Sequence, residues 1–338
     1  MARSRTIWLV VATLVSLAAG LVGLASSPAR GGVAAAGTVV TGQYANAYGA
    51  RTYRLYIPSG YRTQRAPLVV MLHGCTQTAA DFALGTEMDA VAERETFLVL
   101  YAEQDPLANP GQCWNWFEPA HQARGAGEPS ILAGMTNDVV SRYRVDRSRV
   151  YAAGLSAGAA MTVIMGATYP DLYAAIGVSA GLEYRAAANL AEALVAQQTQ
   201  GPDPDGQGAL AALASGGAKR VVPTIVFHGQ LDLTVAVANG HQVLAQWAQT
   251  NDLVDDGNDN GSVIATPASS ATATVPGGYA YTRFVYNDRR GRPLMEKWLI
   301  EEMRHAWSGG SSAGSYTDAK GPKASDEMWR FFRDRRNR

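Results

Sequence analysis

Apolar residues in this chain gather into short runs typical of strands, and longer amphipathic segments lie between them. The segment at 67–74 is apolar up to its last two residues and ends in glycine, which indicates a buried strand of a mostly parallel sheet. The stretch at 53–58 alternates polar and apolar positions, as a half-buried strand does. Further strands are expected at 97–101, 149–154, 173–178, 221–227, 280–286 and 295–301, and helices at 89–95, 134–143, 157–168, 239–249 and 325–333.

This alternation of strands and helices predicts an α/β fold, with a mostly parallel sheet flanked by helices. Two stretches interrupt the rhythm. Residues 186–219 are rich in Ala, Gly and Gln and are a candidate cap over the functional site, whereas the polar residues 251–278 are typical of a surface loop. Because no repeat or linker is evident, residues 37–338 are expected to form one domain.

The N-terminal residues 1–36 have the organisation of a secretory signal peptide. Arg3 and Arg5 form a positive segment, and an apolar run follows at 6–25. A membrane anchor is the alternative, because this run approaches the ~20 residues that span a bilayer, but its Gly, Ala and Ser content favours cleavage and export. We therefore expect a secreted protein with no stable membrane association after cleavage. Three cleavage positions stay open, after Ala25, Ala29 or Ala36.

Charge and cysteine content narrow the classes of partner. The 338 residues include 29 Lys and Arg and 29 Asp and Glu, so no basic surplus exists to neutralise phosphates, and no nucleic-acid partner is expected. The two cysteines, Cys75 and Cys113, match no metal-binding spacing, and neither a metal nor a cofactor is expected. In an exported protein this even number predicts one disulfide, with two free buried thiols as the alternative.

A glycine-rich motif at 154–158 introduces candidate chemistry. Its residues, Gly-Leu-Ser-Ala-Gly, fit G-x-S-x-G with Ser156 at the centre, between a predicted strand and an alanine-rich predicted helix. This context is typical of a nucleophile elbow, a sharp turn whose flanks need small residues. The start of the helix also adds partial positive charge where an oxyanion would form. The alternative is a glycine-rich turn with a bystander serine.

A nucleophilic serine needs a base, and in this arrangement an acid lies between the two in the chain. Only His241 and His305 follow Ser156 with room for such an acid. His241 falls in a predicted amphipathic helix and is expected to be structural. His305 follows a predicted strand and opens the loop at 305–310, where catalytic residues commonly lie, so His305 is the expected base.

The acid that orients this base is also expected in a loop after a strand. Asp232 has this position, after the predicted strand at 221–227. His228 precedes Asp232 and closes the strand, so we expect it to shape the turn. The competing acids lie in the polar stretch and are expected to be solvated: Asp252, Asp255 and Asp256.

Acyl transfer also requires two hydrogen-bond donors for the oxyanion. The backbone N–H of Ala157, directly after the serine, is the first candidate, and the loop after the early strand supplies the second, the N–H of Cys75. A disulfide from Cys75 to Cys113 would hold that loop and bring Trp114 and Trp116 beside the site. Packing in the core is the alternative for these tryptophans.

Taken together, these motifs resemble those of the extracellular short-chain-length poly(3-hydroxyalkanoate) depolymerase family, from about residue 40 to the end. The resemblance implies an α/β-hydrolase fold with a triad of Ser156, Asp232 and His305. It implies oxyanion donors at Cys75 and Ala157, and an aromatic-lined crevice to which we assign Trp116 and Trp307. Feruloyl and acetylxylan esterases belong to the same broad family. The segments that carry the resemblance are 72–77, 113–117, 154–158, 228–232 and 305–310.

Three features depart from the family pattern. Members that erode solid polymer usually carry a linker and a separate polymer-binding domain, and nothing of this kind follows the motifs here. Arg304 stands where a glycine commonly precedes the histidine, and residues 251–278 contain no recognisable motif. The first feature argues against solid-polymer degradation and leaves the ester chemistry intact.

The sequence therefore predicts a monomeric, secreted serine esterase that hydrolyses short-chain 3-hydroxyacid esters, of a polymer or its oligomers, through an acyl-enzyme. Two alternatives share the same triad. One is a carbohydrate esterase that releases feruloyl or acetyl groups, and the other is an acyltransferase that uses an alcohol in place of water. A complete triad disfavours a non-catalytic binding protein.

Overall fold

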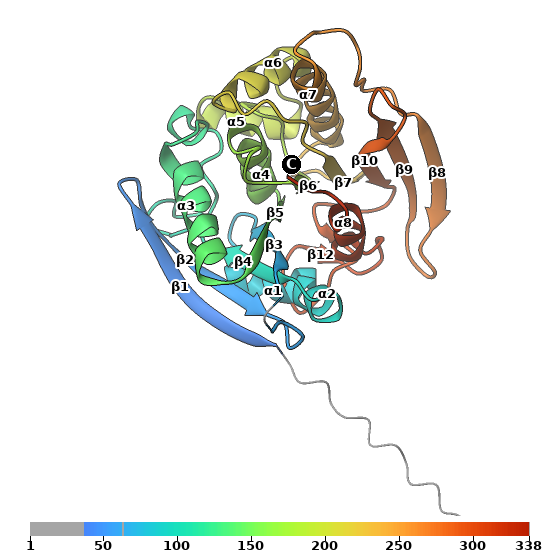
Figure 1. Ribbon diagram of the computed structural model, residues 1–338. Coiled ribbons are helices and arrows are strands. Elements are labelled where there is room, and N and C mark those ends of the chain that lie inside the picture. The colour runs from blue at the N-terminus through green and yellow to red at the C-terminus, as the bar shows by residue number, and fades with distance from the viewer. Residues whose placement is uncertain (1–36, 63, 338) are drawn as a thin grey trace, which may run out of the picture. The chain divides into compact units, whose positions relative to one another are not determined.

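A large, mostly parallel sheet organises the part of the chain that the computed structural model describes, residues 37–62 and 64–337 (Figure 1). The predicted signal segment at 1–36 lies outside these residues. Within them the strands lie in the order β1 (Thr38–Asn46), β2 (Gly49–Ile57), β4 (Leu98–Ala102), β3 (Ala66–Leu72), β5 (Val145–Leu155), β6 (Ala175–Ser179), β7 (Thr224–Gly229), β10 (Pro293–Ile300), β9 (Ala280–Asn287) and β8 (Ser269–Thr274). The strands from β4 to β10 are parallel, and antiparallel strands form both margins.

The central strands are buried on both faces. Every residue of β3, β4, β6 and β7 is buried. Side chains of β3 alternate between two cores, with Leu68 and Val70 in one and Val69 and Met71 in the other. A strand covered on both sides has no polar face, which explains why apolar runs predicted these strands.

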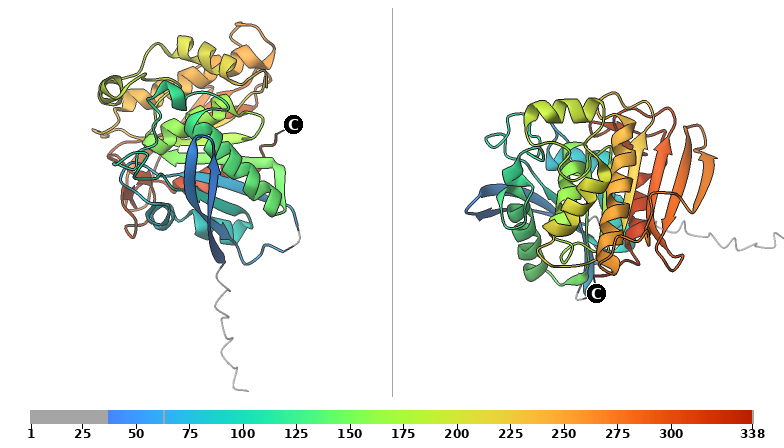
Figure 2. Two further views of the ribbon diagram at one scale, coloured as in Figure 1. Left: turned by 90° about the vertical axis from the view of Figure 1, so that its left-hand side faces the viewer. Right: turned by 90° about the horizontal axis from the view of Figure 1, so that it is seen from above.

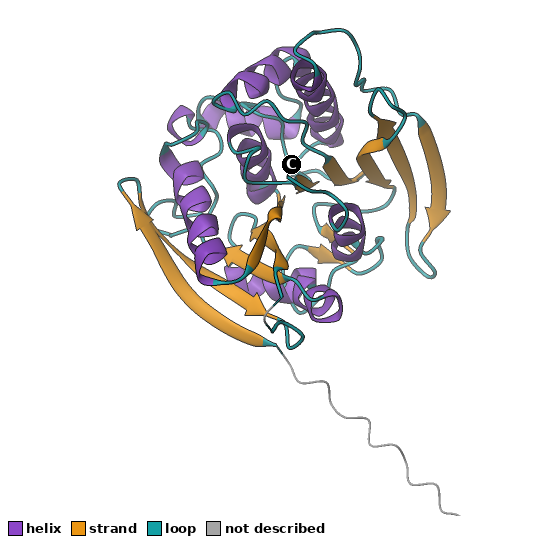
Figure 3. Ribbon diagram, in the orientation of Figure 1, coloured by secondary structure: helices purple, strands orange, loops and turns teal. Residues whose placement is uncertain are grey.

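Helices cover both faces of this sheet (Figure 2 and Figure 3). The core that holds Leu68 also includes residues of α3 (Gly127–Arg142), α4 (Ala157–Thr168) and α7 (Val237–Asp255), and the opposite core includes α1 (Ala79–Thr86), α2 (Met88–Glu95) and α8 (Ala324–Phe332). The predicted α/β architecture is therefore confirmed. Within the described residues, no helix is both long enough and apolar enough to span a membrane.

The alanine-rich stretch at 186–219 folds as two helices, α5 (Leu190–Gln198) and α6 (Pro204–Ala214). The Asn189 side chain accepts a hydrogen bond from the backbone N–H of Glu192 and caps α5, and the Asp203 side chain caps α6 in the same manner. Small alanine side chains give little amphipathic contrast, and the helices were therefore not evident from periodicity.

The polar stretch at 251–278 is a surface loop only in its middle, which corrects the prediction. Helix α7 continues to Asp255, and β8 pairs with β9 at the margin of the sheet, so 256–268 form the loop and 275–278 belong to the short turn between β8 and β9. All six residues of β8 are exposed. Because this strand is held by backbone pairing and buries no side chain, it lacks the apolar alternation that predicts a strand.

Candidate active site

The turn at Ser156 joins β5 to α4 and has the geometry of a nucleophile elbow. Ser156 adopts φ 57° and ψ −122°, a strained conformation for a residue with a side chain. Its backbone N–H donates to the carbonyl of Ser179 at 2.9 Å. A Cβ at Gly154 would lie 2.4 Å from the carbonyl oxygen of Gly158, and one at Gly158 would lie 2.1 Å from that of Leu72. Both flanking glycines are therefore required by close backbone packing.

Ser156 and His305 line the same cavity, which has a volume of about 280 Å³. Its walls come from several segments of the chain, so the fold assembles a site from parts far apart in sequence. Four of these segments are the loop after β3, the loop near Cys113, the loop near Tyr316 and helix α5. The remaining lining residues are Gly74, Cys75, Cys113, Trp116, Phe117, Leu155, Leu190, Ala193, Leu194, Gln197, Thr234 and Tyr316. Since α5 contributes four of them, the candidate cap does form a wall of the cavity.

A buried carboxylate lies behind His305. The imidazole Nδ1 is 2.7 Å from Oδ2 of Asp232, and Oδ1 accepts the backbone N–H groups of Thr234 and Val235 at 2.9 Å and 2.8 Å. Burial by itself would raise the pKa of Asp232, but the hydrogen bond and charge of His305, together with the Val235 N–H, hold that pKa below its ordinary value. Asp232 is therefore a carboxylate at neutral pH, and Nδ1 of His305 carries a proton that it donates to Oδ2.

Backbone contacts tie the loops of these two residues together. After β7, the N–H of Gln230 donates to the carbonyl of Ile300 at 2.8 Å, and the N–H of Leu231 donates to that of Met303 at 3.0 Å. A Cβ at Gly229 would lie 2.3 Å from the Met303 carbonyl oxygen, so a glycine is needed where the loops touch. Arg304, the departure from the family pattern, is exposed.

The two predicted oxyanion donors occupy positions that leave their N–H groups available. Ala157 is the first residue of α4, and the first N–H groups of a helix have no intrahelical acceptor. In the loop after β3, the Gly74 N–H donates to Gln77 Oε1 at 2.9 Å and the Thr76 N–H donates to a carbonyl at 2.8 Å. Within the described residues, the N–H of Cys75 between them has no acceptor.

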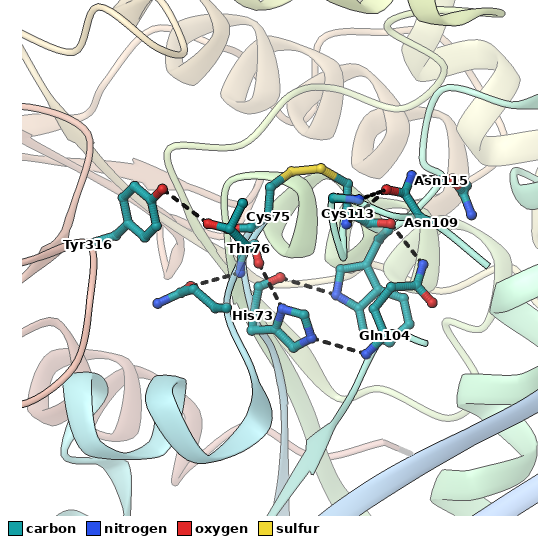
Figure 4. Close-up of a disulfide and its surroundings, with 12 residues drawn as sticks. His73, Cys75, Thr76, Gln104, Asn109, Cys113, Asn115 and Tyr316 are labelled. Carbon is teal, nitrogen blue, oxygen red and sulfur yellow. Dashed lines mark hydrogen bonds between the residues drawn. A yellow bond between two sulfur atoms is a disulfide. The ribbon is translucent and has the colours of Figure 1, made fainter. Parts of the chain in front are cut away.

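A disulfide joins Cys75 to Cys113, as predicted (Figure 4). It links the loop after β3 to the loop that carries the tryptophans, and the indole of Trp114 donates to the carbonyl of His73 at 3.1 Å. His73 is itself fixed, because Nδ1 lies 2.7 Å from the Gly74 carbonyl while Nε2 accepts a backbone N–H. Burial lowers the pKa of His73, so this ring is neutral and serves as a structural support.

The two tryptophans assigned to substrate differ in position. Trp116 lines the cavity, as expected. Trp307 does not, which corrects its assignment: it is 0% exposed, packs edge-on against Phe82, and donates its indole N–H to Ser325 Oγ at 3.1 Å. An aromatic residue close to the histidine in sequence can face the cavity or the core, and no periodic pattern in this short loop distinguishes the two.

Sequence reasoning missed Tyr316. Its ring lines the cavity, and its centroid lies 6.4 Å from that of His305 in an edge-on arrangement. Tyr316 also has φ 50°, which is uncommon for an aromatic residue.

His241, which the sequence analysis rejected as the base, lies in α7 with Nδ1 2.7 Å from Nζ of Lys297 and does not line the cavity. In the described part of the chain, no group of three or more His, Cys, Asp or Glu residues is arranged to hold a metal.

Comparison with known proteins places this site in a family. Residues 51–264 match the family model described as Esterase PHB depolymerase. The chain is 37% identical over 253 residues to poly(3-hydroxyalkanoate) depolymerase C of Paucimonas lemoignei, which covers 74% of this chain and 57% of that protein. It is 30% identical over 276 residues to feruloyl esterase B of Neurospora crassa, which covers 79% of this chain and 88% of that protein.

Solved structures show the same fold. An acetyl xylan esterase from Aspergillus awamori aligns with a TM-score of 0.67 and 22% identity, over 87% of this chain and 98% of that chain. The architecture is thus that of the α/β-hydrolases. The chain spans little more than half of the length of the depolymerase it matches. Because the family model covers more than half of the sequence, this protein belongs to the Esterase PHB depolymerase family.

Proposed function

We propose that this protein is a secreted serine esterase that hydrolyses short-chain 3-hydroxyacid esters, with Ser156 as nucleophile, His305 as base and Asp232 as the orienting acid. One observation carries the proposal. Ser156 and His305 line one cavity, and Oδ2 of Asp232 lies 2.7 Å from Nδ1 of His305. Serine on a strained turn, a held imidazole and a buried carboxylate are the parts of a hydrolytic triad.

In this proposal the two nitrogens of His305 have different tasks. Nδ1 is committed to Asp232, which leaves Nε2 as the nitrogen that accepts the proton of Ser156 Oγ. Oγ then attacks the ester carbonyl carbon, and the carbonyl oxygen becomes an oxyanion. In this proposal the N–H groups of Cys75 and Ala157 donate to that oxyanion.

Collapse of this intermediate breaks the bond to the leaving alcohol, which takes its proton from Nε2. An acyl-enzyme on Ser156 remains. Water then gives a proton to Nε2 of His305 and attacks the acyl carbon, and a second collapse releases the acid and returns the proton to Oγ. Asp232 keeps its negative charge throughout and stabilises the imidazolium that forms twice in the cycle.

The cavity supports a short acyl or alcohol group as substrate. Its volume of about 280 Å³ lies just below the range of about 300 to 1,000 Å³ that is usual for ligand pockets. Leu190 and Leu194 of α5 and Trp116 on the disulfide-linked loop supply apolar walls. Membership in the Esterase PHB depolymerase family favours 3-hydroxyacid esters as the ester that fits there.

A carbohydrate esterase is the second candidate. The match to feruloyl esterase B covers 88% of the length of that protein, whereas the match to the depolymerase covers 57% of its length. Feruloyl esterase B is therefore similar to this protein over nearly its whole length. The proposed acyl-enzyme serves either substrate, and the two candidates differ only in the acyl and alcohol groups that the cavity admits.

A substrate panel separates these candidates. Soluble 3-hydroxybutyrate oligomers, feruloyl sugars and acetylated xylan are assayed at matched ester concentration with wild type, Ser156→Ala and the exposed-serine control Ser141→Ala. We expect oligomer hydrolysis by wild type and the control, and its loss by about 10⁴-fold or more in Ser156→Ala. Activity of a folded Ser156→Ala protein would refute the mechanism. Release of ferulate or acetate without oligomer cleavage would move the assignment to the second candidate.

A further inference from the structure

A chain of two hydroxyl groups connects Tyr316 to the backbone of Cys75 (Figure 4). Tyr316 Oη lies 3.1 Å from Oγ1 of Thr76, and that Oγ1 lies 2.6 Å from the carbonyl oxygen of Cys75. A threonine hydroxyl has one proton, and the Cys75 carbonyl can only accept. The direction is therefore fixed: Tyr316 donates to Thr76, and Thr76 donates to Cys75.

The two residues that supply these hydroxyl groups have unusual backbone conformations. Thr76 has φ 65° and Tyr316 has φ 50°, both in the left-handed region that residues with side chains rarely adopt. Such conformations persist where surrounding contacts determine them, and they concentrate at functional sites. Here Tyr316 lines the cavity that Ser156 lines, and Thr76 directly follows Cys75, which lines it as well.

A second set of contacts fastens the same two loops. The Gln77 side chain accepts the Gly74 N–H through Oε1 at 2.9 Å, and its amide nitrogen donates to the Ser315 carbonyl at 3.0 Å. Asp81 Oδ1 accepts the Ser315 N–H at 2.9 Å. The loop at 315–316 thus contacts Thr76 and Gln77 directly, and the Gln77 side chain in turn holds Gly74 on the other side of Cys75. The Cys75 N–H itself is left without an acceptor among the described residues.

We propose that Tyr316 is a positioning residue for the oxyanion donor: through Thr76 it fixes the peptide plane between Cys75 and Thr76. This plane adjoins the one that carries the Cys75 N–H, whose Gly74 carbonyl is held by His73, so that the N–H is presented to the developing oxyanion. This inference rests on the proposed esterase function. The Cys75 N–H is useful to the transition state only if its direction is set in advance, because a donor that must reorient contributes little. The disulfide anchors the side chain of Cys75, whereas the hydroxyl chain anchors its carbonyl, and together they leave the residue little freedom to rotate.

Four single variants and the Tyr316→Phe/Thr76→Ala double variant test this role. Tyr316→Phe removes only the donor, Thr76→Ala removes the relay, and Thr76→Ser keeps the relay hydroxyl. Tyr61→Phe is the matched control, because the Tyr61 hydroxyl also bonds a backbone group, the Arg144 N–H at 2.8 Å, yet does not line the cavity. Three quantities are measured: kcat and KM on a short-chain ester, affinity for an alkyl boronic acid that adds to Ser156 Oγ and places an oxygen among the oxyanion donors, and amide hydrogen exchange of the loop 74–77.

We expect Tyr316→Phe and Thr76→Ala to lower kcat by about tenfold, a fraction of the loss from deleting a donor outright, with KM little changed. Boronic acid affinity should fall by the same factor, and exchange in the loop should rise. Thr76→Ser should restore wild-type values, the Tyr316→Phe/Thr76→Ala double variant should lose no more than the worse single variant, and Tyr61→Phe should change none of the three.

Unchanged kcat and boronic acid affinity in Tyr316→Phe would overturn the inference, and so would a change in KM alone, which would make Tyr316 only a wall of the cavity. Additive losses in the double variant would also overturn it. Failure of the proposed function has a different signature, since the wild-type protein would then neither hydrolyse esters nor bind the boronic acid. Loop exchange does not depend on activity and would still show whether Tyr316 orders the Cys75 segment.

Discussion

Replacing Asp232 by asparagine tests the proposed triad one atom at a time. Oδ1 of Asp232 accepts the N–H groups of Thr234 and Val235 at 2.9 Å and 2.8 Å, so an asparagine keeps its carbonyl oxygen at that position. Its NH2 group then takes the place of Oδ2, 2.7 Å from Nδ1 of His305. Because an NH2 group can only donate here, Nδ1 has to accept, and the ring proton moves to Nε2. That nitrogen can then no longer take the proton of Ser156.

The expected cost follows from this wrong tautomer. Forcing the imidazole into it lowers kcat by about 10⁴-fold in a serine hydrolase, which corresponds to about 5.5 kcal/mol of transition-state stabilisation. KM should change little, because Asp232 does not line the cavity. Initial rates on p-nitrophenyl butyrate give kcat and KM, and circular dichroism with thermal unfolding shows whether the variant is folded.

Asp252→Asn is the matched control for this experiment. Asp252 was expected to be solvated, but the structure corrects this: near the end of α7 it is fully buried, because its carboxylate accepts backbone N–H groups of the following loop, from Asn260, Gly261 and Val263. We expect this variant to lose thermal stability and to keep its kcat. A folded Asp232→Asn protein with more than about a tenth of wild-type kcat would refute Asp232 as the acid.

Three further predictions concern stability. Gly158→Ala should abolish folding or lower the free energy of unfolding by at least about 3 kcal/mol in a urea titration, because the added Cβ would lie 2.1 Å from the Leu72 carbonyl oxygen. A urea unfolding midpoint equal to that of wild type would contradict this close approach of the two backbone segments. Replacing Cys75 and Cys113 by serine opens a 38-residue loop and should cost about 4 kcal/mol in the same titration, with a loss of activity; an unchanged kcat would show that the loop holds without the disulfide. Glu183 is 2% exposed, neither of its carboxylate oxygens has a partner among the described residues, and burial, with a smaller effect of a nearby carboxylate, raises its pKa to about 8. The native state therefore keeps a proton that the unfolded chain releases near its ordinary pKa of 4.5, so this group makes unfolding free energy decline as pH rises from about 4.5 to about 8. Glu183→Gln should flatten that decline and be the more stable protein at pH 8; equal slopes in urea titrations at pH 5 to 8 would contradict this.

The sequence predicted the parts of the fold that bury apolar side chains. The strand at 67–74 was evident because β3 is covered on both faces, so its composition has to be apolar. At the margins this reasoning fails. The strand β8 is fully exposed and is held by backbone pairing to β9, an interaction that depends on no particular side chain and therefore leaves no pattern in the sequence.

In the candidate site, too, some residues were evident from the sequence and others were not. Ser156 and His305 were predicted to lie together because a strained turn and a loop after a strand need particular residues at fixed positions, and the structure places both in one cavity. Trp307 was assigned to the cavity on its place beside His305 and lies in the core instead. Tyr316 was missed because what distinguishes it, a left-handed backbone and a bond to Thr76, 240 positions earlier, exists only in three dimensions.

Proposed chemistry and substrate choice are carried by separable elements of this fold. The nucleophile, base and acid follow β5, β10 and β7, and backbone contacts join the acid and base loops, so they cannot shift independently. Helix α5 lines the same cavity but is inserted after β6, and its end is joined to the acid loop by the Ala236 N–H, which donates to the Gln197 carbonyl at 2.7 Å. Changes at Leu190 or Leu194 would therefore reshape the apolar wall while leaving the atoms around Ser156 in place. Under the proposed function, changes in α5 would therefore alter which ester is accepted without rebuilding the proposed triad.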